Sequence, residues 1–254
     1  MEIGVFSGCI AGETFEEKFS ELKRIGYDFL ELSTKAEYIE ALPEGGDELR
    51  EASKAAEMPV LSANLGNFPS FSQTCRDADA RKELFAGLDA VCDLLAEWGP
   101  GAVLLLPVWE GEGGMEVEDA YIQNLTAVGD RAESRSVRLA LEHIGSSKFC
   151  PKASEILALV RKVGHGNIGF YFDIGNCQMA GEDPVKVLET AGGDLYQVHL
   201  KGTRDTPFDQ MPLTDIEMLL GNMGFKGRAA VEIPAHGDNT HLEQALELIR
   251  KTGF

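Results

Sequence analysis

The stretch of residues 138–173 reads RLALEHIGSSKFCPKASEILALVRKVGHGNIGFYFD, and its pattern recurs through the whole chain. It begins with a short apolar run, Arg138–Glu142, and ends with another, Gly169–Asp173. Between these runs, apolar residues recur at the spacing of one helix face: Ile156, Leu159, Val160 and Val163. Continuous apolar runs of this length are typical of parallel strands that are covered on both faces. The stretch therefore predicts a strand, an amphipathic helix and a second, parallel strand.

The same alternation of strand and helix continues from this stretch to both ends of the chain. Further short apolar runs, bounded by Gly, Pro, Asn or Asp, are Ile3–Phe6, Phe29–Leu32, Val60–Ala63, Val103–Leu106, Leu195–His199 and Ala229–Ile233. Eight strand–helix units in 254 residues fit a closed (β/α)8 barrel better than an open sheet. We therefore predict an α/β fold, a TIM barrel with a closed parallel sheet, in which residues 1–254 form a single domain.

The composition narrows the classes of protein to which the chain can belong. Its net charge of −19 argues against nucleic acids and anionic membranes as partners. The longest apolar stretch, around Val103–Val108, is too short to span a bilayer, and the first strand begins too close to Met1 for a signal peptide. Five cysteines at irregular spacing, without a C-x-x-C pair, favour reduced thiols over a disulfide framework. We expect a soluble, cytoplasmic protein.

Each of the last four predicted strands ends at or near a side chain that can bind a metal ion: Glu142, Asp173, His199 and Glu232. The carboxyl ends of barrel strands converge at the active-site end, and alternate residues of each strand point inward. Charged residues directly after apolar runs are also costly to bury without partners. Three carboxylates and one imidazole suit a single divalent metal, with Mn²⁺ favoured and Co²⁺, Mg²⁺, Fe²⁺ or Zn²⁺ as alternatives.

The segments around these residues resemble those of the xylose-isomerase-like sugar isomerase and epimerase barrels. They read Leu141-Glu142-His143, Phe172-Asp173-Ile174-Gly175-Asn176, Val198-His199-Leu200-Lys201 and Val231-Glu232-Ile233-Pro234. That superfamily includes ketose 3-epimerases, hydroxypyruvate isomerases and inosose-processing enzymes. The similarity covers nearly the whole chain and is sharpest from the fifth strand to the eighth. It implies that the four residues named above bind the metal.

One position departs from the pattern of this superfamily. Its members often carry His three residues after the Asp of the sixth strand, where this chain has Asn176. An Asn side chain can hydrogen-bond a sugar hydroxyl but cannot serve as a general acid, which leaves the identity of the substrate open. The related apurinic endonucleases bind several metals through additional histidines, whereas Ala63-Asn64-Leu65 and Pro107-Val108-Trp109 contain none. Together with the acidic net charge, this makes an endonuclease a less favoured alternative.

The leading functional hypothesis is a divalent-metal-dependent sugar isomerase or epimerase, which transfers a proton through a metal-stabilised enediolate. Glu142 and Glu232 are the expected acid–base residues. The candidate substrate-binding residues are Asn176, Lys201, Arg204, Trp109 and His236. A lyase or dehydratase that acts on a keto-sugar or cyclitol remains an alternative, as does a non-catalytic sugar-binding subunit. We expect a small sugar or keto-polyol as the substrate. An aromatic loop that contains Phe68 and Phe71 is compatible with a homo-oligomer, by analogy with barrels that pair through this end.

Overall fold

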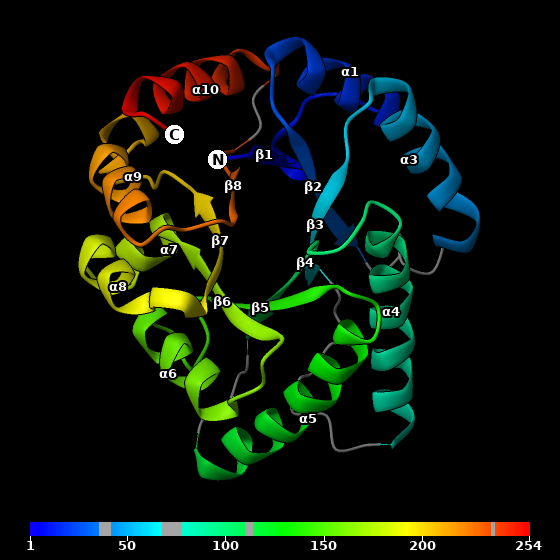
Figure 1. Cartoon of the computed structure of the whole chain (residues 1–254), viewed down its shortest axis with the longest axis vertical. Coiled ribbons are helices and arrows are strands. Elements are labelled where there is room, and N and C mark those ends of the chain that lie inside the picture. Colours follow the sequence, from blue (N-terminus) through cyan, green and yellow to red (C-terminus); the bar gives the residue numbers. More distant parts are fainter. Residues whose placement is uncertain (36–41, 68–77, 110–113, 235–236) are drawn as a thin grey trace.

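The computed structural model describes the whole chain except residues 36–41, 68–77, 110–113 and 235–236. Its strands are β1 (Ile3–Phe6), β2 (Phe29–Lys35), β3 (Val60–Asn67), β4 (Val103–Val108), β5 (Arg138–His143), β6 (Ile168–Asp173), β7 (Leu195–Leu200) and β8 (Arg228–Val231). Each strand pairs in parallel with the next along the chain, and β1 pairs with β8 (Figure 1). The sheet is therefore a closed barrel of eight strands, which confirms the predicted fold.

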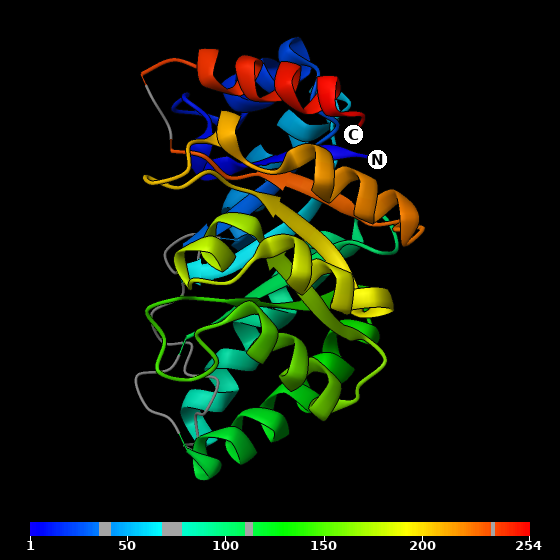
Figure 2. The same cartoon turned by 90° about the vertical axis from the view of Figure 1, so that its left-hand side faces the viewer.

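Helices surround the barrel. They are α1 (Phe15–Ile25), α3 (Leu42–Ala56), α4 (Ala78–Ala96), α5 (Met115–Glu133), α6 (Ala153–Val163), α7 (Ile174–Met179), α8 (Pro184–Ala191), α9 (Leu213–Asn222) and α10 (Thr240–Thr252). Short 3-10 turns are η1 (Ser7–Cys9), η2 (Gly192–Asp194) and η3 (Phe208–Gln210). Figure 2 shows α10, α9, α8 and α6 stacked in this order along one side of the barrel. The chain ends lie near each other in both views.

All eight predicted strands are present, and two boundary differences affect the candidate site. Strand β2 continues to Lys35, beyond the predicted end at Leu32, so Glu31 lies well inside it. Strand β8 ends at Val231, so Glu232 is the first residue after the strand. The backbone of Glu232 still donates a hydrogen bond to the carbonyl oxygen of Leu200 at 3.1 Å, which continues the pairing with β7 by one residue.

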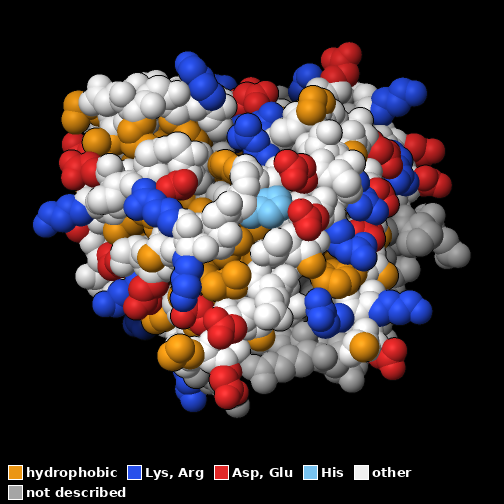
Figure 3. Space-filling view, turned by 60° about the horizontal axis from the view of Figure 1, so that its bottom comes forward, with side chains coloured by type: hydrophobic (Ala, Val, Ile, Leu, Met, Phe, Trp, Pro, Cys, Tyr) orange, Lys and Arg blue, Asp and Glu red, His pale blue; other side chains and the backbone are white. Residues whose placement is uncertain are grey.

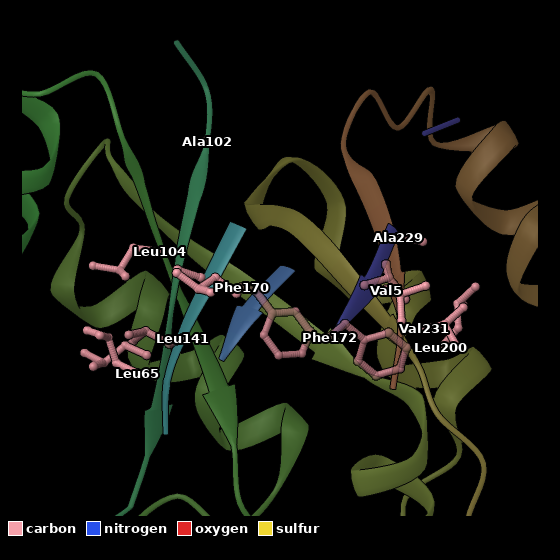
Figure 4. Close-up of a cluster of buried hydrophobic side chains, with 14 of the residues drawn as sticks. Val5, Leu65, Ala102, Leu104, Leu141, Phe170, Phe172, Leu200, Ala229 and Val231 are labelled. Carbon is pink, nitrogen blue, oxygen red and sulfur yellow. The ribbon is translucent and has the colours of Figure 1, made fainter. Parts of the chain in front are cut away.

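Residues alternate along each strand between the barrel interior and the surrounding helices. On β5 and β6, the side chains of Leu141, Phe170 and Phe172 belong to the large apolar cluster between barrel and helices (Figure 4). Ala140 and Tyr171, which lie between such residues in sequence, belong to a separate cluster within the barrel. This period of two also directs Glu142 and Asp173 inward, because each follows an outward-facing residue.

Charged side chains of both signs are intermixed on the molecular surface, despite the net charge of −19. Figure 3 shows Lys and Arg close to Asp and Glu, with small hydrophobic patches between them. Many of these neighbours form ion pairs, such as Arg135 with Asp93 at 2.6 Å and Arg161 with Asp194 at 2.7 Å. Among the described residues, no helix has the length and apolar character that crossing a membrane requires.

Candidate metal centre

Four side chains from neighbouring strands meet at the carboxyl end of the barrel. Glu142 ends the inward-facing series of β5, Asp173 that of β6 and His199 that of β7, and Glu232 follows β8. Asp173 and His199 are register partners on adjacent strands. One possible ligand atom of each of the four residues lies within 4.8 Å of those of the other three. The structure thus brings together all four residues that the sequence singled out as metal ligands.

His199 lies at the centre of this group, and its two ring nitrogens face different partners. Its Nδ1 is 3.1 Å from Glu142 Oε1, 3.1 Å from Glu232 Oε2 and 3.7 Å from Asp173 Oδ2. Its Nε2 is 2.6 Å from Glu31 Oε1, on the opposite side of the ring. The imidazole therefore presents Nδ1 to the carboxylates of the candidate centre and is held at Nε2 by a fourth carboxylate.

Glu31 was not singled out in the sequence, although it is a fully buried acid inside β2. Besides His199, its carboxylate accepts hydrogen bonds from Tyr171 Oη at 2.6 Å, Ser62 Oγ at 2.7 Å and Gln197 Nε2 at 3.0 Å. A signal was present in the sequence, because Glu31 interrupts the apolar run Phe29–Leu32. Its partners come from strands distant in the sequence, so only the closed barrel shows how its charge is accommodated.

The two carboxylate oxygens of Asp173 have different roles: one accepts a hydrogen bond from the backbone, and the other faces the candidate centre. Its Oδ1 accepts a hydrogen bond from the backbone N–H of Asn176 at 2.7 Å, which makes Asp173 the N-cap of helix α7. This bond leaves Oδ2 directed at His199 and Lys201. The side chain of Asn176 donates from Nδ2 to the carbonyl oxygen of His143 at 3.3 Å. In the structure, Asn176 thus fixes the α7 turn against β5.

Lys201 extends from the end of β7 into the same group of carboxylates. Its Nζ donates to Glu232 Oε1 at 3.0 Å and lies 3.4 Å from Asp173 Oδ2. The side chains of Lys201 and Glu232 are each 23% exposed, whereas those of Glu142, Asp173 and His199 are 3% exposed or less. Lys201 and Glu232 are therefore the members of the group that face the opening of the barrel.

Burial and mutual charge shift the pKa values within the group. Burial, together with the negative charges of Asp173 and Glu232, raises the pKa of Glu142 to about 8. Burial would also raise the pKa of Asp173, but the Lys201 ammonium and His199 hold it below the ordinary range. Burial opposes the charged form of His199, yet Glu31 and Glu232 raise its pKa well above the ordinary value. The group as a whole therefore favours a cation, either as bound protons or as a metal ion.

The donor set fits a divalent metal ion. Three carboxylates supply oxygen ligands, and His199 directs one ring nitrogen at them. Oδ2 of Asp173 is buried and makes no hydrogen bond, so it keeps lone pairs available on the side that faces the other donors. Oxygen-rich sites with one imidazole suit divalent ions from Mg²⁺ to Zn²⁺. Hence the geometry is compatible with a single metal bound by Glu142, Asp173, His199 and Glu232.

Comparison with known proteins identifies the family. The family model described as xylose isomerase-like TIM barrel matches residues 19–252. The chain belongs to this family. In curated sequences, it is similar to the inosose isomerase of Bacillus velezensis, with 24% identity over 215 residues, which cover 83% of this chain and 73% of that protein.

Solved structures of similar fold match the present chain along nearly its whole length. The 3-keto-D-glucoside 4-epimerase of E. coli superimposes with a TM-score of 0.81 at 15% identity, covering 99% of each chain. The IolI protein, solved with a bound zinc atom, superimposes with a TM-score of 0.76 at 18% identity, covering 99% of this chain and 96% of the other. At these identities, the likeness establishes the fold.

In this xylose isomerase-like barrel, the other predicted substrate-binding residues have different placements. Trp109 directly follows β4 and is 62% exposed. Arg204 is exposed and lines a cavity of about 510 Å³ between the loop after β7 and helix α10, with Phe208 and His241. His236, Phe68 and Phe71 lie outside the described residues. Among the described candidates, Lys201 is thus the one whose side chain contacts the candidate ligands, whereas Asn176 contacts Asp173 through its backbone.

Proposed function

We propose that this protein is a divalent-metal-dependent isomerase or epimerase of a small sugar or keto-polyol. The observation that carries the proposal is the meeting of Glu142, Asp173, His199 and Glu232 within 4.8 Å at the carboxyl end of the barrel. In TIM-barrel enzymes this end holds the active site. The family membership and the similarity to an inosose isomerase support the same reaction class. Mn²⁺ is the ion we favour from the donor set.

The bound metal would act as a Lewis acid that polarises a substrate carbonyl and acidifies the neighbouring C–H bond. Glu232 is suited to accept that proton, because its side chain is 23% exposed and faces the opening. Glu142 reaches the same centre from β5 and, at 3% exposure, is shielded from bulk water. Glu142 is therefore suited to return a proton to the substrate, with reprotonation from solvent between turnovers.

Lys201 is suited to bind the oxygen that carries the developing negative charge. Its ammonium lies between Glu232 and Asp173, so it reaches the opening without leaving the site. A fixed positive group at that point would stabilise negative charge more in the transition state than in the ground state. The exposed ring of Trp109 offers an apolar surface for the C–H face of a sugar.

The test is hydrogen exchange in D₂O with the Mn²⁺-loaded protein. A panel of ketoses, aldoses, hydroxypyruvate and inososes would be followed by proton NMR for loss of carbon-bound hydrogen. We expect exchange at one carbon next to a carbonyl in at least one substrate. Glu232→Gln should lower the exchange rate by roughly 10²–10⁴-fold, the usual contribution of a general base. Glu189→Gln, an exposed position on α8, is the matched control and should exchange at the wild-type rate.

The products distinguish the reaction types. An inverted centre at the exchanging carbon identifies an epimerase, and a shifted carbonyl identifies an isomerase. A product that has lost water would replace the proposal with a dehydratase on the same scaffold. A metal-loaded protein that exchanges no hydrogen across the panel would overturn the proposal.

A further inference from the structure

A layer of polar side chains lies inside the barrel, directly beneath the candidate metal centre. Glu31 and Ser62 are register partners on β2 and β3, and Tyr171 and Gln197 are register partners on β6 and β7. All four side chains are fully buried. The two pairs meet in the barrel interior, because Tyr171 Oη and Gln197 Nε2 both lie within 3.0 Å of Glu31 Oε2. Apolar residues would fill this space without the cost of burying a charge, which indicates that the carboxylate of Glu31 has a role other than packing.

The two oxygens of the Glu31 carboxylate have separate partners. Oε2 accepts from the hydroxyls of Ser62 and Tyr171 and from the amide of Gln197. Oε1 contacts Nε2 of His199 at 2.6 Å. Because three donors already occupy Oε2, the carboxylate acts as an acceptor, and the proton in the contact with His199 belongs to the imidazole. When a metal displaces the second proton of the imidazole, the proton that remains is the one on Nε2 facing Glu31, and Nδ1, which faces the other carboxylates, is the nitrogen with a lone pair.

We propose that Glu31 is a positioning residue that fixes the tautomer and ring orientation of His199 for metal binding through Nδ1. The inference rests on the proposed metal-dependent function and adds a residue that the pattern of four ligands does not contain. A carboxylate on the far nitrogen of a metal-binding imidazole orients the ring and raises its basicity as a ligand. Ser62, Tyr171 and Gln197 hold that carboxylate by its other oxygen, so they act one step further from the metal.

The separate roles of the two oxygens allow a matched experiment. Zinc affinity would be measured by chelator competition in the wild type, Glu31→Gln and Ser62→Ala. Glu31→Gln removes the charge that faces His199 and should weaken zinc binding by about 10–100-fold, the usual effect of losing such a partner. Ser62→Ala removes one donor to Oε2 but leaves the Oε1 contact with His199, so its zinc affinity should stay close to that of the wild type. Equal affinity in all three proteins would overturn the proposal.

A second measurement needs no variant and remains informative if Glu31→Gln fails to fold. In ¹⁵N-labelled wild-type protein saturated with Zn²⁺, long-range ¹H–¹⁵N spectra report which nitrogen of each histidine carries a proton. We expect a zinc-dependent imidazole with a protonated Nε2 and a metal-shifted Nδ1. A zinc-dependent imidazole protonated at Nδ1 instead would overturn the proposal.

Failure of this inference and failure of the proposed function give different results. If the wild type binds zinc and Glu31→Gln binds it equally well, the role of Glu31 is wrong while the metal centre stands. If zinc binding depends on Glu31 but no substrate exchanges hydrogen, the role of Glu31 stands and the isomerase proposal is wrong. If the wild type binds no divalent metal, both are overturned.

Discussion

At the scale of single residues, the candidate centre is defined by the balance between its negative carboxylates and its positive groups. Three carboxylates converge on one imidazole, and Lys201 supplies a positive charge at 3.0 Å from Glu232 and 3.4 Å from Asp173. The same ammonium opposes binding of a second cation. Because opposite charges at this separation attract by a few kcal/mol near a protein surface, Lys201 should influence both metal affinity and stability.

We predict that Lys201→Met tightens metal binding while it lowers catalytic turnover. Removing the ammonium leaves the carboxylates less neutralised, so Mn²⁺ affinity should rise on the order of tenfold, equivalent to about 1.4 kcal/mol. Turnover should fall, because the variant lacks the group proposed to stabilise the substrate oxygen. The checks are a Mn²⁺ titration and the exchange assay, with Lys186→Met on α8, where the side chain is 79% exposed, as the control. Weaker Mn²⁺ binding in Lys201→Met would contradict this assignment.

At the scale of secondary-structure elements, helix ends position the barrel units. Helix α1 begins with a capping box, in which Glu17 N–H donates to Thr14 Oγ1 at 3.2 Å and Thr14 N–H donates to Glu17 Oε2 at 3.3 Å. It ends at Gly26, which has φ of 100°, a left-handed conformation that glycine adopts without strain. The chain then enters β2, the strand that carries Glu31. The capped ends of α1 thus help to set where β2, the strand that carries Glu31, begins.

We predict that Thr14→Ala lowers the free energy of unfolding by about 1 kcal/mol, because the first turn of α1 loses its side-chain cap. Urea denaturation followed by circular dichroism would measure the change. Ser20→Ala, an exposed site in the middle of the same helix, is the matched control and should leave the free energy of unfolding unchanged or slightly higher. A loss of equal size in both variants would argue against the capping role.

At the scale of the whole molecule, burial within a single closed barrel controls how stability depends on pH. Burial raises the pKa of Cys92 to about 12 and, in the same way, raises the pKa of Cys177 to about 12. In the unfolded chain, both thiols titrate near their ordinary value of about 8.5. The unfolded state therefore loses these protons first as the pH rises, which favours unfolding. The stabilising contribution is complete below the ordinary pKa and is lost between about pH 9 and the folded-state value of about 12.

We predict that the free energy of unfolding decreases steeply above about pH 9, with each buried thiol contributing at most about 1.4 kcal/mol per pH unit. Cys92→Ala should reduce that slope, in addition to a loss of stability at every pH from the cavity it leaves. Urea denaturation at several pH values between 8 and 11 would provide both quantities. An unchanged slope in Cys92→Ala would show that this thiol does not contribute to the alkaline transition.

The sequence by itself determined the eight strands, their parallel order and the four residues that meet at the carboxyl end. Those predictions succeeded because they rest on local signals: apolar runs, helical stripes and a charged residue at or beside the end of each strand. Convergence of the four then follows from the topology, since parallel strands of a closed barrel end on one face.

The tertiary structure alone decided how the side chains contact one another. Glu31 and His199 are 168 residues apart, so no local pattern connects them, and their contact requires the barrel to close. The orientation of Asn176 toward the β5 backbone and of Lys201 toward Asp173 and Glu232 depends likewise on the packing of neighbouring strand ends. A charge within an apolar run signals that a partner must exist, because an unpaired charge is costly to bury. The identity of that partner is determined only when distant strands come into register.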